Sequence, residues 1–270
     1  LYVFAPYRFV DLYVRGAIGE HVAFVFPPLI LYFLLKLSKK YSWWFIVGGS
    51  LSLASLILSH NAISLIFLPI IFLYGLYLVW QTKRRKLLVM SYGLLVALGF
   101  GLSAFFWFPA FFEGKYTLRD IVTSGEYASR FVSFESLLYG PWNYGGSGQF
   151  TTQVGIVQWL VVIASLVAMI YLYRKKNSLW TIAVGALTTF FLTLFLMTAG
   201  SSTIWQTISI LQKFQFPWRF LSVTVFVTAV LGVLVIFAVP KRTQLVTCYL
   251  LLVELLFFNK DYWHAKDYVH

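Results

Sequence analysis

The chain has 270 residues, of which 60% are hydrophobic, 20% aromatic and only 11% charged, and its mean hydropathy is +0.80. Soluble domains are roughly 45–50% apolar and about 25% charged, so this composition excludes an ordinary soluble protein and predicts an integral membrane protein. A net charge of +12 can indicate a nucleic-acid partner. It can also arise from basic residues in the loops on one side of a membrane protein, so the positions of the charges decide between the two.

Apolar runs that approach the ~20 residues needed to cross a bilayer core recur along the whole chain. They lie at about 21–36, 42–59, 62–80, 87–111, 151–173, 179–198, 219–239 and 244–258. The first run carries Pro27 and Pro28, so we expect it to be tilted or locally broken. The predicted fold class is all-α, a polytopic transmembrane helix bundle of about eight spans plus an N-terminal partial span at 1–6.

Residues 1–270 are predicted to form a single transmembrane domain. The chain opens on Leu1 inside an apolar stretch, so we expect it to be a fragment of a longer protein.

Lys and Arg gather in four short loops that alternate with the other connections. These clusters are Lys36, Lys39 and Lys40; Lys83 to Lys86; Arg174 to Lys176; and Lys241 with Arg242. None of the nine acidic residues lies in these loops, so the charge follows the positive-inside rule. We therefore expect no nucleic-acid partner, and a multi-pass protein of the plasma (cytoplasmic) membrane. Its residues 7–20 and the long loop 112–150 are predicted to be extracytoplasmic.

Two cations and two carboxylates lie within the fourteen residues YRFVDLYVRGAIGE at 7–20. Asp11 and Arg15 are four residues apart and therefore share one face of a helix. We expect a short interfacial helix that ends at Gly16 or Gly19. The charges are either a salt-bridged anchor or the lining of a polar cavity, in which arginines bind phosphate.

Two further outer segments are long enough to hold structure. In the loop 112–150, EYASRFVSFESLLY has helical spacing of apolar residues, and GPWNYGGSGQF offers Trp142 and Tyr144 either to a sugar or to an interfacial aromatic belt. Residues 199–218 are predicted to form an outer interfacial helix behind a Ser201 or Ser202 cap.

Pro217 is predicted to begin the next span. Arg219 after it either snorkels to lipid phosphate or, with Lys213 or Gln215, neutralises the phosphate of a leaving group.

His60 and Asn61 lie where two predicted spans meet, and such a pair either satisfies a helix-hairpin turn or hydrogen-bonds a substrate. Glu254, inside the last predicted span, either has a functional role or pairs across helices. Asp261/His264 and Asp267/His270 have spacing that could mimic metal ligands, but no fuller site accompanies them. We expect no cofactor, and these pairs alone do not support a divalent metal.

Four motifs, in order along the chain, resemble a known family. They are YRFVDLYVRGAIGE, LSHNAISLIFLP at 58–69, ESLLYGPWNYGGSGQFTTQVG at 135–155 and QKFQFPWRFL at 212–221. The chain is identified as a member of the bacterial and archaeal "6-pyruvoyl-tetrahydropterin synthase-related" membrane proteins, which resemble GT-C glycosyltransferases. The resemblance implies transfer of a sugar from a polyprenyl-phosphate donor on the outer face, usually with inversion. It also implies a principal carboxylate base in a first outer loop, which would precede Leu1.

The leading hypothesis is therefore a GT-C-like glycosyltransferase whose partners are membrane lipids and a polyprenyl-phosphate sugar donor. Candidate catalytic residues are Asp11 and Glu20, and candidate substrate- or phosphate-binding residues are Arg8, Arg15, His60, Asn61, Glu113, Trp142, Tyr144, Gln215 and Arg219. The alternatives are a transporter or flippase for a lipid-linked or small substrate, and a non-catalytic membrane scaffold in envelope assembly. The sequence does not give the oligomeric state.

Overall fold

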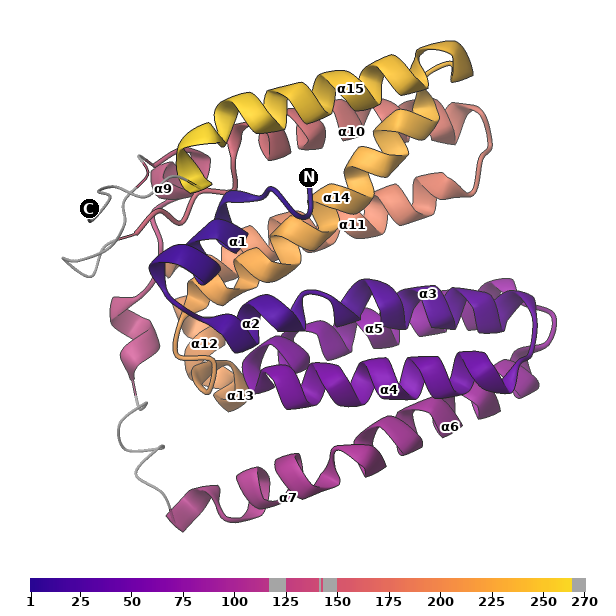
Figure 1. Ribbon diagram of the computed structural model, residues 1–270, viewed down its shortest axis with the longest axis vertical. Coiled ribbons are helices and arrows are strands. Elements are labelled where there is room, and N and C mark those ends of the chain that lie inside the picture. The colour runs from indigo at the N-terminus through magenta and orange to yellow at the C-terminus, as the bar shows by residue number, and fades with distance from the viewer. Residues whose placement is uncertain (117–124, 141, 143–149, 264–270) are drawn as a thin grey trace, which may run out of the picture. The chain divides into compact units, whose positions relative to one another are not determined.

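The computed structural model describes residues 1–116, 125–140, 142 and 150–263 (Figure 1). All secondary-structure elements assigned in these residues are helices, which confirms the predicted all-α class. The chain divides into two compact units. The first unit comprises Leu1–Ala17 and Gly125–His270, and the second comprises Ile18–Ser124. The single transmembrane domain stays a prediction.

The second unit is a group of antiparallel apolar helices. Its elements are α2 (Ile18–Ala23), α3 (Phe26–Lys39), α4 (Trp43–Ser59), α5 (Asn61–Gln81), α6 (Arg85–Leu102) and α7 (Ala104–Phe112). Helix α4 packs against both α3 and α6, and the Ser50 hydroxyl on α4 donates to the Leu95 carbonyl of α6 at 3.0 Å. Small residues and hydroxyl groups allow such close packing between apolar helices.

The first predicted span is broken, as expected. Helices α2 and α3 are separated at Phe24 and Val25, directly before the two prolines in the first turn of α3. Proline fits the first turn of a helix because the N–H it lacks has no partner there.

The apolar run at 87–111 holds a candidate span, Arg85–Leu102, that ends earlier than predicted, because the chain turns at Ser103 between α6 and α7. The Ser103 hydroxyl donates to the carbonyl of Gly99 at 2.9 Å, and serine side chains compete in this way for backbone groups. Helix α7 beyond the turn buries none of its residues and exposes four phenylalanines.

The first unit is built around α14 (Leu221–Ala238), which packs against α10 (Ile156–Arg174) and α11 (Leu179–Met197). The hydroxyls of Thr193 and Thr224 lie 3.2 Å apart and join α11 to α14. A 3-10 turn, Pro217–Phe220, leads directly into α14, which confirms Pro217 as the start of this span. Helix α15 (Lys241–Phe258) is mostly exposed, with Leu255 as its buried residue.

Each of the eight predicted spans contains a helix, but six helical segments in the described chain are long and apolar enough to cross a membrane. Helix α4 has 17 residues, about 26 Å at 1.5 Å per residue, which is shorter than the ~30 Å hydrocarbon core. Helix α15 is not among the six and carries three charged residues, Lys241, Arg242 and Glu254. The count of eight spans is thus a prediction, and the count of six rests on length and composition.

The two segments predicted to lie at the outer face contain shorter helices than their apolar spacing predicts. Residues 199–218 form two short helices, α12 (Ser202–Thr207) and α13 (Ser209–Gln212), instead of one, because the backbone at Ile208 is extended. Ser201 does not cap α12, since its hydroxyl donates to the carbonyls of Leu196 and Thr198. The stretch EYASRFVSFESLLY contains a 3-10 helix (Glu126–Ser129) and α9 (Phe134–Leu138) instead of a continuous helix.

Candidate functional site

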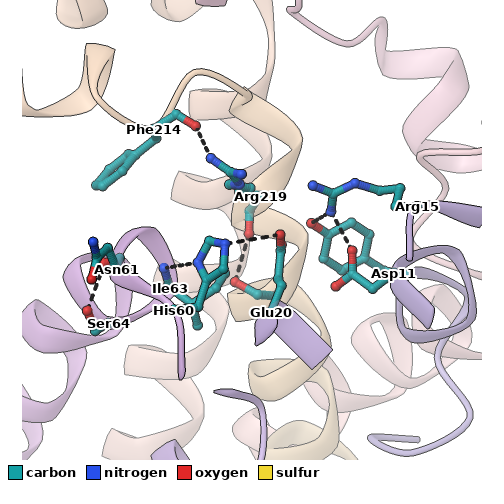
Figure 2. A network of polar contacts seen from close by, with 11 residues as sticks. Asp11, Arg15, Glu20, His60, Asn61, Ile63, Ser64, Phe214 and Arg219 are labelled. Atoms are coloured by element: carbon teal, nitrogen blue, oxygen red, sulfur yellow. Dashed lines mark hydrogen bonds and ion pairs between the residues drawn. The ribbon is translucent and has the colours of Figure 1, made fainter. Parts of the chain in front are cut away.

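A buried ion pair lies near the start of the first unit. Helix α1 (Pro6–Phe9) continues into a π-helix, Val10–Val14, that holds Asp11. Arg15 Nη1 donates to Asp11 Oδ1 and, at 3.1 Å, to the Tyr7 hydroxyl (Figure 2). The Asp11 side chain is fully buried, whereas that of Arg15 is 14% exposed. The predicted Asp11–Arg15 contact is therefore confirmed, and π-helical turns of this kind are frequent at functional sites.

Gly16 ends this helix. Its φ is +60°, a conformation that favours glycine, and the Ala17 N–H donates to the Asp11 carbonyl at 2.7 Å across the turn. Gly19 has another role, because a Cβ there would lie 2.7 Å from the Ser59 carbonyl oxygen within the second unit. Of the two predicted helix ends, the structure selects Gly16.

Arg8 lies beside the ion pair and is 9% exposed. Its guanidinium carbon is 5.2 Å from the centre of the Tyr2 ring, a cation–π contact. Burial lowers the pKa of Arg8, while Tyr2 and Asp11 act in the opposite direction. Desolvated guanidinium groups interact strongly with anions, so Arg8 adds positive charge near Asp11.

A second acidic centre lies in the second unit. Glu20 on α2 is fully buried, and its Oε2 is 3.9 Å from Nε2 of His60 (Figure 2). His60 Nδ1 accepts the Ile63 backbone N–H at 3.3 Å. A ring nitrogen that accepts a hydrogen bond carries no proton, so the proton of a neutral His60 ring is on Nε2, which faces Glu20.

Both members of the predicted His60–Asn61 pair serve the turn between α4 and α5. His60 is the N-cap residue of α5, and the Asn61 carbonyl accepts the Ser64 hydroxyl at 2.7 Å. These contacts are those that a helix-hairpin turn needs. A role of either residue in binding a substrate stays a prediction.

The cap predicts a measurable stability difference. Replacing His60 by alanine removes the acceptor for the Ile63 N–H and should destabilise the protein by about 1 kcal/mol. His60→Asn restores a capping oxygen and should recover most of the loss. Thermal unfolding in detergent micelles measures both variants, and equal midpoints for His60→Ala and the wild type would refute the capping role.

Arg219 lies in the 3-10 turn that leads into α14. Its Nη1 donates to the Phe214 carbonyl at 2.6 Å (Figure 2), and its guanidinium carbon is 4.9 Å from the Phe216 ring centre. Gln215 between these two residues has a left-handed backbone, with φ of 60°. The structure brings Gln215 and Arg219 into one short segment but shows no contact of the Gln215 side chain that would position it for phosphate.

The remaining candidates are scattered. Glu113 is exposed at the end of α7, Trp142 stacks on Tyr262 at 4.6 Å between ring centres, and Glu254 is half-buried on α15. Tyr144, His264, Asp267 and His270 lie outside the described residues. Within the described residues, His, Cys, Asp and Glu form no group of three that could hold a metal ion.

The hydrogen bond between Gln153 and Tyr262 was not predicted from the sequence. Gln153 Nε2 donates to the Tyr262 hydroxyl at 3.0 Å and to the Gly140 carbonyl at 2.7 Å. Burial is the main reason that the pKa of Tyr262 is raised to about 12. These residues are 109 apart in sequence, and no local spacing could predict their contact.

The fold and these centres define an all-helical membrane protein with buried charged residues. The chain belongs to a family described as "6-pyruvoyl-tetrahydropterin synthase related domain; membrane protein", whose sequence model matches residues 1–269. This match confirms the family resemblance of the four motifs.

Among curated proteins, the chain is similar to an "Uncharacterized protein" of Lactococcus lactis subsp. cremoris (strain MG1363). The two are 27% identical over 147 residues, which cover 53% of this chain and 24% of that protein. The similarity therefore spans about a quarter of the relative. No solved structure matches the chain.

Proposed function

We propose that this protein transfers a sugar from a polyprenyl-phosphate-linked donor at the extracytoplasmic face of the membrane. The supporting observation is the buried Asp11 of the π-helical turn, which accepts from Arg15, while Arg15 also donates to the Tyr7 hydroxyl. Buried ion pairs add little stability over apolar residues of the same size. Binding of a ligand therefore explains such a pair in a hydrophobic protein better than stability does. The guanidinium fork of arginine suits phosphate, which it binds through two N–H groups.

In the proposed reaction, the acceptor hydroxyl loses its proton to a carboxylate, and its oxygen attacks the anomeric carbon of the sugar. The bond from that carbon to the phosphate oxygen breaks, and the lipid phosphate leaves with the electron pair. Arg8, Arg15 and Arg219 stabilise the charge that develops on the phosphate.

Glu20 is the stronger candidate for the base among the residues present. The Oδ1 of Asp11 accepts a charge-assisted hydrogen bond from Arg15, which makes that oxygen a poor proton acceptor. Glu20 is the other predicted carboxylate, and it is fully buried with its Oε2 3.9 Å from His60 Nε2. Asp11 is then a positioning residue for Arg15.

The experiment that tests the proposal measures sugar transfer in membranes that contain the full chain and a labelled polyprenyl-phosphate sugar. Arg15→Lys keeps the positive charge beside Asp11 but removes the fork, and should lower transfer by about 10- to 100-fold, which corresponds to the loss of one charge-assisted hydrogen bond. Arg174→Lys is the matched control, because Arg174 is exposed at the end of α10. Equal turnover of Arg15→Lys and the control would refute the phosphate role of Arg15.

A transporter or flippase is the second candidate, because interrupted helices supply substrate sites in transporters. The break between α2 and α3 is such an interruption. Uptake or flipping of the lipid-linked sugar by reconstituted vesicles, without transfer to an acceptor, would favour this alternative over the enzyme.

A further inference from the structure

A group of cationic and aromatic side chains in the first unit is unexplained by the ion pair of Asp11. It consists of Arg130, Phe150, Phe216, Trp218 and Arg219, which we call the Phe216 cluster. Arg130 follows the 3-10 helix Glu126–Ser129. Phe150 precedes α10, and the other three members lie in the short segment before α14.

The guanidinium groups of Arg130 and Arg219 both contact the Phe216 ring. The guanidinium carbon of Arg219 is 4.9 Å from the centre of Phe216, and that of Arg130 is 5.9 Å from the same centre. The two carbons are therefore no farther apart than these distances together, and their like charges repel. Arg130 is exposed, and the ion pairs found in the described part of the chain do not include it. An anion held between the two guanidinium groups could accept from both of them.

The aromatic members hold the ring in place. Phe216 stacks on Trp218, with ring centres 4.8 Å apart and planes 12° apart, and Phe150 meets Trp218 edge-on at 5.3 Å. The indole Nε1 of Trp218 is buried and has no hydrogen-bond partner among the residues described. Buried indole N–H groups usually have a partner, so this donor indicates a missing acceptor.

The backbone of the cluster is strained in a way that orients it. The Phe216 N–H donates to the Phe214 carbonyl at 2.6 Å across Gln215, whose φ of 60° is rare for a residue other than glycine. The same carbonyl accepts Arg219 Nη1, so one oxygen fixes the ring and the guanidinium relative to each other. Strained backbone of this kind is concentrated at ligand-binding sites.

We propose that the Phe216 cluster binds a phosphate ester, with Arg130 and Arg219 on its anionic oxygens and Trp218 Nε1 as an additional donor. Arginine pairs match the geometry of phosphate oxygens, and aromatic faces beside them suit an attached sugar or lipid glycerol. Arg130 is a binding residue that its sequence context does not reveal. The assignment of this phosphate to the sugar donor rests on the proposed function, whereas the binding itself does not.

The test uses the purified full chain with two phosphate probes. One arm measures binding of soluble pyrophosphate in detergent by calorimetry. The other measures binding to nanodiscs of phosphatidylcholine with and without phosphatidic acid. Arg130→Gln should weaken binding by about tenfold or more in at least one arm, as expected for the loss of a charge-assisted hydrogen bond, and Arg130→Lys should lie between. Arg174→Gln, at another exposed arginine, should bind like the wild type.

The arms separate the sources of the phosphate. An effect in the nanodisc arm alone supports a lipid headgroup, and an effect in the pyrophosphate arm supports a phosphate site open to soluble phosphates. Equal affinities of Arg130→Gln and the wild type in both arms would overturn the inference. If Arg130→Gln weakens binding but no sugar transfer is found, the proposed function fails and the phosphate site stands. If sugar transfer is found but binding does not depend on Arg130, the proposed function stands and the phosphate site at Arg130 fails.

Discussion

Replacement of Arg15 by alanine is expected to destabilise the protein by about 3–5 kcal/mol, the cost typical of removing one partner from a buried ion pair. The Asp11 carboxylate is fully buried, and without Arg15 its charge would lose a direct charge-assisted hydrogen bond. The Tyr7 hydroxyl would lose a donor as well. Thermal unfolding of the purified chain in detergent should show a lower midpoint, and expression in membranes should fall.

The double variant Asp11→Asn/Arg15→Gln tests the origin of this loss. It removes both charges and keeps side chains of similar volume, so it should be markedly more stable than Arg15→Ala, since pairs replaced together cost less than pairs broken. Arg15→Ala with a wild-type midpoint would show that Asp11 does not depend on Arg15. A double variant no more stable than Arg15→Ala would assign the loss to packing of the Arg15 stem.

The pair was predictable because it is local. Residues four apart on a helix meet, and the apolar runs located a helix in each predicted span, because the bilayer sets their length. The π-helical turn that buries Asp11 was not predictable, since its extra residue per turn leaves no mark in the apolar pattern. Nor was the Tyr7 contact, eight residues from Arg15.

Breaks within apolar runs divide into two kinds. The break before α3 was predicted because Pro27 and Pro28 mark it, whereas the one at Ser103 was missed because its apolar neighbours continue the run on both sides. Contacts between distant segments were also missed. Glu20 with His60, and Arg130 with Phe216, are 40 and 86 residues apart, and only the packing of helices and loops brings them together.

Glu20→Gln is expected to lower the rate of sugar transfer by about 10²–10⁴-fold, the usual contribution of a general base. Glutamine has nearly the same shape as glutamate, so the buried site beside His60 should remain packed, and the thermal midpoint should change little. Binding of the donor should persist, because Glu20 is assigned no contact with phosphate. Single-turnover measurements with a labelled donor separate the chemical step from binding.

Two matched variants decide which carboxylate accepts the proton. Glu135→Gln removes an exposed carboxylate on α9 and should leave transfer unchanged. Asp11→Asn should weaken donor binding through Arg15, with a smaller effect on the chemical step than Glu20→Gln, since a positioning residue acts on the orientation of its partner. If Asp11→Asn abolishes the chemical step while Glu20→Gln turns over normally, Asp11 is the base and the assignment of Glu20 is wrong. Normal single-turnover rates in both variants would show that neither carboxylate is the base, and the reaction would then require a base from outside these two residues.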